Sequence, residues 1–294
     1  QRPALAPPLR PIGPLHLDTC PDTRTPRVSI VIPTYGQHLH TFNCLVSLKE
    51  HTDLSQVEVI VVDDTFAQPL TDALAQTTGV HWLRNPENLG FIGSCRVGSA
   101  EARGDFVLLL NNDVQVCAGW LDALLEVFER HPDAGLAGAR LVYPDGSLQE
   151  AGGIVWRDGS GWNWGRGQDP EHPHFRYLRE ADYCSGACLL LRRADWLALE
   201  GFDRAYAPAY YEDTDLAMRV RARGQKVFYQ PEALVIHHEG ITSGTDLGQG
   251  VKKHQVINQK TFFERWRATL ANHRPNGEQP RREADRGTGA WVLV

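Results

Sequence analysis

Polar side chains interrupt a strongly apolar run in the middle of this sequence. The run VLLLNNDVQV (107–116) has Asn111, Asn112 and Asp113 directly after three leucines. Asparagine and aspartate are poor strand formers, so we expect a strand to end at these residues. An aspartate in this position often belongs to a turn. Its carboxylate is also the hard oxygen ligand that Mg²⁺ and Mn²⁺ prefer, which makes Asp113 a candidate metal ligand.

A second pair of acids, Asp63 and Asp64, ends the apolar run VEVIVVDD (57–64). These residues can simply cap a strand and lead into a loop. An acid at the end of a buried strand can also accept hydrogen bonds from the ribose or base of a nucleoside. The sequence alone leaves both interpretations open.

A third acidic cluster precedes an expected helix in YYEDTDLAMRVRARG (210–224). Acids in the first turn of a helix are favoured by the helix dipole, and this is the simplest explanation for Asp215, which can also pair with Arg219 one turn later. Glu212 and Asp213 come earlier and are freer to face a cleft. One of these carboxylates could serve as a general base.

Two histidines, His237 and His238, follow another apolar run in the segment HHEG (237–240). A histidine in such a position is most often structural. Near a carboxylate site, a neutral imidazole could complete the coordination of a metal ion.

The elements that must position these groups alternate in the first half of the chain. Continuous apolar strands that alternate with helices predict a parallel sheet covered on both faces. Such sheets bind ligands at the carboxyl ends of their strands, where Pro33, Thr34 and Tyr35 also fall. The polar residues at these strand ends are therefore expected to share one rim: 33–35, 63–64 and 111–113. The expected strands are 28–35, 57–64, 80–85 and 105–113, and the expected helices are 41–51, 69–77, 92–102 and 120–128.

The second half of the chain is less regular, and residues 156–164 are expected to form strands and loops. Gly224 is a typical left-handed stop after the helix at 214–224. The other expected elements are a short strand followed by a helix within 183–199, strands at 226–230 and 233–238, and a helix at 254–266.

Length and composition suit a soluble globular protein. The 294 residues are 42% hydrophobic with a net charge of −6, which argues against a broad nucleic-acid-binding surface. Six irregularly spaced cysteines indicate reduced core thiols in a cytosolic protein. No apolar run approaches the roughly 20 residues that span a bilayer, and no signal peptide is visible. The chain starts at Gln1 and has one methionine, Met218, so we expect that it can be a piece of a longer polypeptide with other domains.

The domain organisation follows from the distribution of proline, glycine and charge. We expect a proline-rich N-terminal arm or linker (1–26) that is not a core element, a folded domain (27–270) and a frayed C-terminal tail (271–294). Within the folded domain, residues 27–115 form the regular half and residues 116–270 the irregular half.

Several enzyme classes lack their phosphate-binding or nucleophile motifs here. No GxGxxG follows the first strand, which argues against a dinucleotide-dependent dehydrogenase. No GxxxxGK[ST] or GxSxG segment is present either, which argues against a P-loop nucleotidase and an α/β-hydrolase.

The order of the motifs is similar to that of a known family. VSIVIPTYGQ, VEVIVVDD, RNPENLGFIGSCRVG, LLLNNDVQV, the block from YCSGACLLL to YYEDTDLAMRVRARG, and PEALVIHHEG follow one another as in family 2 inverting glycosyltransferases. The resemblance covers roughly residues 27–265 and is strongest to bacterial rhamnosyltransferase-like members that build surface polysaccharides. It implies a GT-A fold, with a Rossmann-like, mostly parallel central sheet flanked by helices and a smaller acceptor-side subregion. Residues 27–115 would then be the nucleotide-sugar half and residues 116–270 the acceptor half.

The resemblance also implies a role for individual residues. Asp113 would bind the metal ion with His237, for which His238 is the alternative. Asp213 would be the general base, with Glu212 as the neighbour that could replace it. The residues implied in holding or shaping the nucleotide-sugar site are Pro33, Thr34, Tyr35, Asp63, Asp64, Asn88, Gly90, Asn111, Asn112 and Asp113.

Three positions depart from the family pattern. Gly36 and Arg96 stand where many relatives have asparagine, and the charge of Arg96 could meet a phosphate or be structural. Asn111 replaces the first acid of the family's D-x-D motif. An asparagine keeps a carbonyl acceptor but loses the charge. Either metal binding would be weaker, or the metal would be held chiefly by Asp113, His237 and the diphosphate.

The implied reaction moves a sugar from a dTDP- or UDP-linked donor to a hydroxyl of a glycan or lipid-linked glycan, with Mn²⁺ or Mg²⁺ as cofactor. The enzyme would be cytoplasmic, with at most peripheral contact with the inner face of the bacterial membrane. A sugar nucleotidyltransferase is one alternative, although PTYGQHLHTF lacks the basic residues expected after its first strand. A non-catalytic glycosyltransferase-like module of a larger protein is the other.

Aromatic residues in the second half could stack on acceptor sugars. Trp162, Trp164 and Tyr211 are the main candidates, beside Trp156 and Tyr210. Core packing or a mobile flap explains them equally well. The glycine- and serine-containing segment 241–250 is a candidate lid over the donor.

Overall fold

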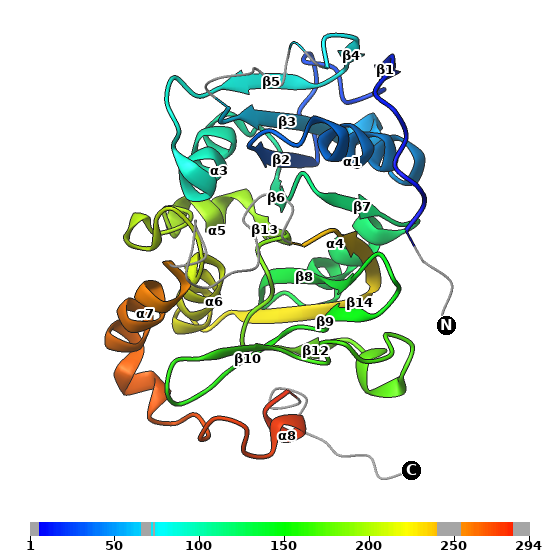
Figure 1. Ribbon diagram of the computed structural model, residues 1–294. Helices are drawn as coiled ribbons and strands as arrows, with labels where there is room; N and C mark the ends of the chain where they lie inside the picture. The colour runs from blue at the N-terminus through cyan, green and yellow to red at the C-terminus, as the bar shows by residue number, and fades with distance from the viewer. Residues whose placement is uncertain (1–5, 66–71, 73, 240–253, 285–294) are drawn as a thin grey trace.

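The fold is built on one long mixed sheet. The computed structural model describes residues 6–65, 72, 74–239 and 254–284. The sheet has the strand order β12-β14-β8-β13-β6-β2-β3-β5, with β7 paired to β14 and β9 paired to β8 (Figure 1). Its strands are β2 (Val28–Thr34), β3 (Val57–Asp63), β5 (His81–Arg84), β6 (Phe106–Leu110), β7 (Val114–Val116), β8 (Ala134–Val142), β9 (Leu148–Glu150), β12 (Arg179–Glu180), β13 (Cys188–Arg192) and β14 (Lys226–His237).

The first half of the sheet is parallel, as its continuous apolar runs predict. β5, β3, β2 and β6 lie side by side and run in the same direction. The register pairs Thr34 with Asp63, and Asp63 with Arg84, so the polar ends of neighbouring strands meet at one edge. This edge is the rim at which a parallel sheet binds ligands.

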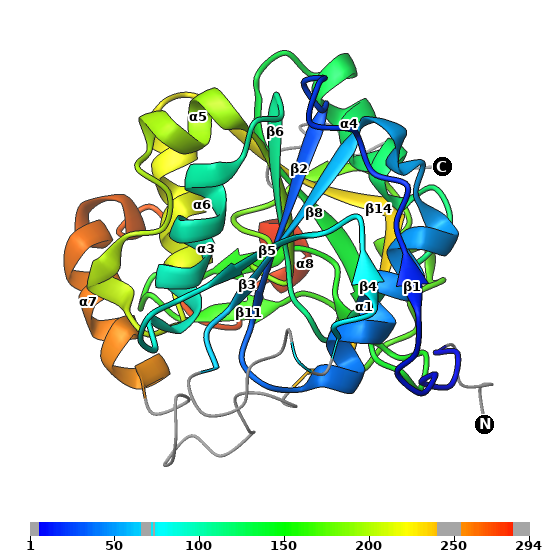
Figure 2. The ribbon, with the colours of Figure 1, turned by 90° about the horizontal axis from the view of Figure 1, so that it is seen from above.

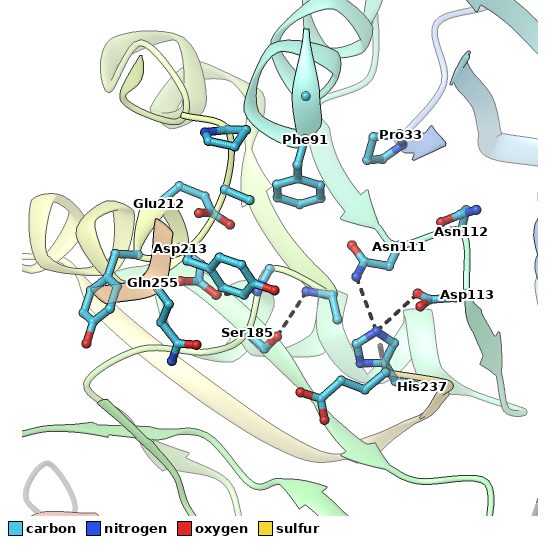
Figure 3. Close-up of a pocket in the computed structure, with 18 of the residues that line it drawn as sticks. Pro33, Phe91, Asn111, Asn112, Asp113, Ser185, Glu212, Asp213, His237 and Gln255 are labelled. Carbon is cyan, nitrogen blue, oxygen red and sulfur yellow. Dashed lines mark hydrogen bonds and ion pairs between the residues drawn. The ribbon is translucent and has the colours of Figure 1, made fainter. Parts of the chain in front are cut away.

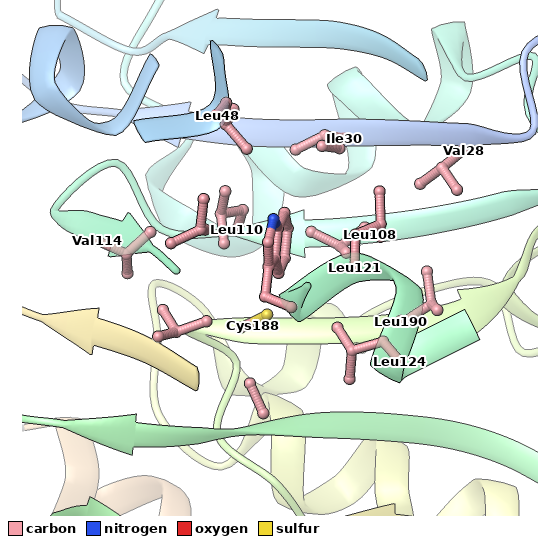
Figure 4. Close-up of a cluster of buried hydrophobic side chains, with 14 of the residues drawn as sticks. Val28, Ile30, Leu48, Leu108, Leu110, Val114, Leu121, Leu124, Cys188 and Leu190 are labelled. Atoms are coloured by element: carbon pink, nitrogen blue, oxygen red, sulfur yellow. The ribbon is translucent and has the colours of Figure 1, made fainter. Parts of the chain in front are cut away.

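Helices cover both faces of the sheet. Seen from above, α3, α5, α6 and α7 lie on one side, and α1 and α4 lie on the other (Figure 2). Each side has its own apolar core. In the core beneath α4, leucines of that helix pack against alternate residues of β2, β6 and β13 (Figure 4). The helices are α1 (His38–His51), α3 (Gly90–Glu101), α4 (Trp120–Arg130), α5 (Arg193–Ala198), α6 (Glu212–Ala222), α7 (His254–Leu270) and α8 (Pro280–Ala284).

The second half of the sheet mixes both directions. β13 is antiparallel to β6 and β8, whereas β14 is parallel to β8. The prediction of two strands at 226–230 and 233–238 is wrong, because one strand, β14, spans both. The register of β14 against β8 shifts between Gln230 and Leu234, an interval that contains Pro231. Proline has no N–H to donate to a ladder, so the strand continues past it only through this irregularity.

The terminal segments pack more closely than their composition suggests. In the arm, β1 (Leu15–His16) pairs with β4 (Thr77–Thr78), and Leu17 is buried, so the expectation that this arm is not part of the core is wrong. Two alternating apolar residues in this proline-rich stretch, Leu15 and Leu17, join the core on the α1 side of the sheet. In the expected tail, Ala284 of α8 packs on Trp156.

Other expectations fall partly outside the described residues. Much of the expected helix at 69–77 lies outside the described residues. The candidate lid at 241–250 and the last ten residues lie wholly outside them. All six cysteines are free, and five are buried, as expected for reduced core thiols. Among the described residues, no helix combines the length and apolar character needed to cross a bilayer.

Candidate active site

A cavity of about 500 Å³ opens at the carboxyl ends of β2 and β6, between the two halves of the sheet. It gathers residues from distant parts of the chain, from Pro33 to Gln255. Most of the residues singled out from the sequence line it, from both walls (Figure 3). Those residues are Pro33, Thr34, Tyr35, Asp64, Asn88, Gly90, Asn111, Asn112, Asp113, Tyr211, Glu212, Asp213 and His237.

One wall of the cavity brings Asp113 and His237 into direct contact. His237 Nε2 lies 3.2 Å from Asp113 Oδ1, and 3.4 Å from Asn111 Nδ2. Both Asp113 and His237 are buried. Antiparallel pairing of β7 with the end of β14 joins the two, since Val114 is opposite His237 in the register. The sheet itself therefore holds the pair together.

The charges of this pair stabilise each other. Burial alone raises the pKa of Asp113, but the charge and hydrogen bond of His237 outweigh it and hold the pKa below its usual value. For His237, burial lowers the pKa, but the charge and hydrogen bond of Asp113, together with the charge of Glu239, outweigh burial, so the pKa is raised.

The second ring nitrogen of His237 has a partner that the sequence did not reveal. His237 Nδ1 lies 3.0 Å from Oε1 of Gln149 on β9. If Nδ1 donates to this carbonyl, the neutral ring keeps its Nε2 lone pair free for a metal ion. No sequence signal points to Gln149, because it lies 88 positions before its histidine and is brought there by the β8–β9 pairing.

His238, the alternative histidine, faces a different environment. Its Nε2 lies 3.1 Å from Gln115 Oε1, and its ring packs edge-on against His40. His238 does not line the cavity. Successive strand residues point to opposite faces, which explains why only one of two adjacent histidines reaches the site.

The donor set around Asp113 fits a divalent cation that is also held by its substrate. Asn111 Oδ1 is buried and has no hydrogen-bond partner among the described residues. Together with the Asp113 carboxylate and His237 Nε2, it offers two oxygens and one nitrogen, and Mg²⁺ and Mn²⁺ accept such ligands along with phosphate oxygens. The part of the chain that the structure describes has no group of three or more His, Cys, Asp or Glu residues that could hold a metal ion alone. A bound ion would therefore need further ligands from a diphosphate or water.

The opposite wall presents Asp213 and Glu212 at the start of α6 (Figure 3). Asp213 Oδ2 accepts a hydrogen bond from Gly186 N at 2.9 Å, and Oδ1 accepts one from Thr214 N at 2.6 Å. Burial raises the pKa of Asp213, although these N–H groups oppose the shift. Burial, and then the charge of Asp213, raise the pKa of Glu212 well above its usual value. Burial therefore disfavours the charged form of both acids.

The turn that presents these acids has an unusual backbone. Tyr210 and Tyr211 both have positive φ, at 78° and 70°. Residues other than glycine pay for this conformation, so surrounding contacts must hold it. Asn258 of α7 supplies them, because its Nδ2 lies 2.7–2.9 Å from the carbonyl oxygens of Tyr206, Ala209 and Tyr210. Sequence reasoning missed Asn258, since nothing local marks it.

Asp215 has the structural role that the sequence predicts. It is fully buried and forms an ion pair with Arg219 at i+4. It also accepts hydrogen bonds from Arg265 and from Trp266 Nε1 of α7. These contacts fasten the start of α6 to α7 behind the cavity.

The two acids that follow β3 differ in position. Asp64 lines the cavity, and it accepts hydrogen bonds from Leu89 N, Gly90 N and Asn85 Nδ2, each at 2.8 Å. It thereby fixes the turn that begins α3. Asp63 is fully buried, accepts a hydrogen bond from Thr65 N and does not line the cavity. The pleat of β3 turns its side chain away from the rim.

Arg96 is structural rather than phosphate-facing. It donates to the carbonyl oxygens of Glu200 and Phe202, and it is not among the residues that line the cavity. Gly90 has φ of 67°, and a Cβ atom there would lie 3.1 Å from Pro208, so this position requires glycine.

The two tryptophans expected at the acceptor site do not reach the cavity. Trp162 packs edge-on against Trp156, with ring centroids 5.0 Å apart, and Trp164 packs against Phe175. The hairpin of β10 (Gly153–Val155) and β11 (Gly161–Asn163) turns Gly161 and Asn163 toward the cavity instead. Alternation along β11 decides this: residues on either side of Trp162 face the site, so Trp162 faces away.

Comparison with known proteins places this arrangement in a family. A model described as "Glycosyl transferase family 2" matches residues 29–197, more than half of the chain. The chain belongs to glycosyl transferase family 2. The match runs from the first core strand through α5, and so includes the strand ends at 33–35 and 63–64 and the turn at 111–113.

Curated relatives in bacteria support this placement. An N-acetylglucosaminyl-diphospho-decaprenol L-rhamnosyltransferase of Mycobacterium tuberculosis is 29% identical over 277 residues, covering 82% of this chain and 87% of the relative. The O-antigen biosynthesis protein RfbC of Myxococcus xanthus is 29% identical over 240 residues, covering 76% of this chain but 18% of the relative. An uncharacterized protein, y4gI of Sinorhizobium fredii, is 32% identical over 231 residues, covering 75% of this chain and 25% of the relative. The chain thus spans a quarter or less of these last two relatives.

Solved structures establish the fold. GalNAc-T7 with UDP, GalNAc and Mn²⁺ superposes with a TM-score of 0.66 at 15% identity, covering 85% of this chain and 50% of that one. The mannosyltransferase PcManGT of Pyrobaculum calidifontis with GDP-Man and Mn²⁺ gives a TM-score of 0.59 at 15% identity, covering 87% and 71%. The glycosyltransferase has the GT-A fold, as predicted from the sequence.

Proposed function

We propose that this family 2 member is an inverting glycosyltransferase that moves a sugar from a nucleoside-diphosphate sugar to an acceptor hydroxyl. The observation that carries the proposal is the division of the cavity. Asp113 and His237 form one wall, and the buried Asp213 forms the opposite wall. Glycosyl transfer needs these two kinds of group at separate places, because negative charge develops on the leaving diphosphate while a proton leaves the acceptor.

Asp213 acts as the general base in this proposal. Its carboxylate removes the proton from the acceptor hydroxyl as that oxygen bonds to the anomeric carbon. The bond from the anomeric carbon to the diphosphate oxygen breaks on the opposite face, so the anomeric configuration inverts. Burial raises the pKa of Asp213 toward the working pH, which makes it a stronger base than an exposed carboxylate. Gly186 N and Thr214 N keep its two oxygens in place.

Asp113, His237 and Asn111 would hold the divalent cation, Mn²⁺ or Mg²⁺. When bound, the cation neutralises charge on the leaving diphosphate. Gln149 keeps the ring of His237 oriented. Pro33, Thr34 and Tyr35 would receive the nucleoside at the other end of the cavity, while Asn88 and Gly90 would shape the wall beside the diphosphate or sugar.

The relatives support a donor and acceptor class. The structural neighbours were solved with UDP or GDP-Man and Mn²⁺, and one curated relative is named for a diphospho-decaprenol acceptor. We propose a dTDP- or UDP-linked sugar as donor and a glycan or lipid-linked glycan as acceptor. A lipid-linked acceptor would bring the enzyme to the inner face of the bacterial membrane, with catalysis on the cytoplasmic side.

The test begins with calorimetric binding of UDP, dTDP and their sugar conjugates, each in the presence of Mn²⁺. Wild-type protein should bind at least one conjugate and release its nucleoside diphosphate during transfer to acceptor or, more slowly, to water. Asp213→Asn should lower this turnover by at least a hundredfold and leave donor affinity within about threefold.

Asp145→Asn is the matched control, because Asp145 is an exposed turn residue outside the cavity that accepts from Ser147. It should behave as wild type. Full turnover in Asp213→Asn would refute the base assignment. Release of pyrophosphate from a nucleoside triphosphate would favour a nucleotidyltransferase instead, and failure to bind any nucleotide would favour a non-catalytic module.

A further inference from the structure

A buried carboxyl group in the cavity has no part in the mechanism described so far. Glu150 is the last residue of β9 and is 1% exposed, yet it lines the cavity. Its Oε1 accepts a hydrogen bond from Ser185 N at 2.8 Å. Its Oε2 is buried and has no hydrogen-bond partner among the described residues.

The position of Glu150 relates it to both walls of the site. Ser185, which donates to Glu150, is followed by Gly186, which donates to Asp213. Gln149, which precedes Glu150, contacts His237. Glu150 therefore lies between the proposed base and the proposed metal site, where the reacting sugars would have to sit.

The neighbours of Glu150 leave its second oxygen available. Tyr183 Oη donates to Asn163 Oδ1 at 3.0 Å, and both of these residues line the cavity. Arg166, whose charge lowers the pKa of Glu150, is engaged by Glu239 and Tyr143. A buried polar atom without a partner is costly, so a ligand that hydrogen-bonds Oε2 is favoured.

The protonation state of Glu150 suits one kind of ligand group. Burial raises its pKa to about 8, and the charge of Asp213 adds to this, against the hydrogen bond from Ser185. At neutral pH the carboxyl group is largely protonated, so it can both donate and accept a hydrogen bond. A sugar hydroxyl also does both, whereas a phosphate only accepts.

We propose that Glu150 recognises the reacting sugars by hydrogen-bonding a pyranose hydroxyl inside the cavity through Oε2. This inference rests on the proposed glycosyltransferase function. The hydroxyl can belong to the sugar of the donor or to the sugar of the acceptor, and the experiment distinguishes the two sources. Glu150 is then a specificity-determining residue for the proposed transfer.

The experiment compares wild type with Glu150→Ala and Glu150→Gln by calorimetry in the presence of Mn²⁺. The probes are UDP and dTDP alone, UDP-glucose, UDP-N-acetylglucosamine and dTDP-rhamnose, and the methyl glycosides of glucose, N-acetylglucosamine and rhamnose with nucleoside diphosphate present. Glu58→Ala is the matched control, because Glu58 is also buried and accepts from a backbone N–H, that of Arg103, but does not line the cavity.

In Glu150→Ala, affinity for one class of sugar should fall about tenfold, while affinity for the nucleoside diphosphates stays within twofold. Loss of the extra affinity that a sugar conjugate has over its nucleoside diphosphate assigns the hydroxyl to the donor. Loss of methyl glycoside binding assigns it to the acceptor. Glu150→Gln should stay within about threefold of wild type, because the amide can still accept from Ser185 N and donate to a hydroxyl.

The inference would be overturned if Glu150→Ala bound every sugar probe as wild type does, or if wild type showed no sugar-dependent affinity. It would also be overturned by evidence of a purely structural role. Such evidence would be an equal loss of nucleoside diphosphate affinity in Glu150→Ala, or the same loss of sugar affinity in Glu58→Ala. Failure of the proposed function is distinguishable, because it requires that wild type bind no nucleoside diphosphate or show no transfer.

Discussion

Replacement of Asn258 by alanine tests how the base is positioned. Asn258 is buried in α7, and its amide nitrogen lies close to three carbonyl oxygens of the turn that leads to α6. That turn contains two tyrosines with positive φ, Tyr210 and Tyr211, directly before Glu212 and Asp213. Among the described residues, the hydrogen bonds of Asn258 go to the turn and those of Asp213 go to Gly186 and Thr214, so we expect an effect on the base to pass through the turn.

The magnitude follows from the two opposing terms. Each left-handed tyrosine costs about 1–2 kcal/mol, or roughly 2–4 kcal/mol for the pair. The two amide hydrogens of Asn258, shared among three carbonyls, contribute about 2–3 kcal/mol at about 1 kcal/mol per hydrogen bond. These terms are similar in size, so loss of the amide should allow the turn to leave its observed conformation for a large fraction of the time.

The expected result is a fall in turnover of about 10- to 100-fold in Asn258→Ala, with nucleoside diphosphate affinity within twofold. Hydrogen exchange measured by mass spectrometry should be faster in a peptide covering 206–216. Thr261→Ala is the control, since Thr261 lies on the same helix and its hydroxyl donates within its own helical turn, to Ile257 O. Unchanged exchange in that peptide, with turnover within twofold of wild type, would refute the reasoning.

Two further changes have defined outcomes. Asp113→Asn keeps an oxygen but loses the charge that faces His237, so the gain in nucleoside diphosphate affinity on adding Mn²⁺ should shrink at least tenfold in calorimetry; an unchanged gain would exclude Asp113 as a ligand. Glu150→Gln should stabilise the protein more at pH 8 than at pH 5, as measured by urea unfolding. The folded-state pKa of Glu150 is raised to about 8, so the native state holds this proton more tightly than the unfolded chain does. The contribution of Glu150 to the free energy of unfolding therefore falls as the pH rises from about 4.5 to about 8, by an amount of the order of a few kcal/mol. An equal effect at both pH values would contradict this.

The parallel half of the fold could be predicted from the sequence. Its strands are continuous apolar runs that can be buried on both faces, and this pattern does not depend on knowing which strands are neighbours. The polar residues that end these runs had to meet at one edge, because parallel strands all end on the same side of the sheet. The prediction that Thr34, Asp64 and Asp113 lie on one rim therefore follows from the shared direction of the strands. All three residues line the cavity.

The orientation of individual side chains could not be predicted in the same way. Adjacent candidates such as Asp63 and Asp64, or His237 and His238, are chemically alike in the sequence. A shift of one residue in a strand turns a side chain to the opposite face, and only pairing with neighbouring strands sets that register. The same alternation points Trp162 away from the cavity, where it packs against Trp156. Its aromatic ring and glycine-rich sequence had suggested a residue that stacks on sugars.

The amino-acid sequence by itself determined the alternation of strands and helices, the rim of polar residues and the family resemblance, because these depend on local patterns and on motif order. Tertiary structure alone decided the contacts of Gln149, Glu150 and Asn258. Each of these residues meets its partner across 35 or more positions of the chain. An isolated polar residue gives no local sign of such a partner, since the contact exists only after distant strands and helices have packed.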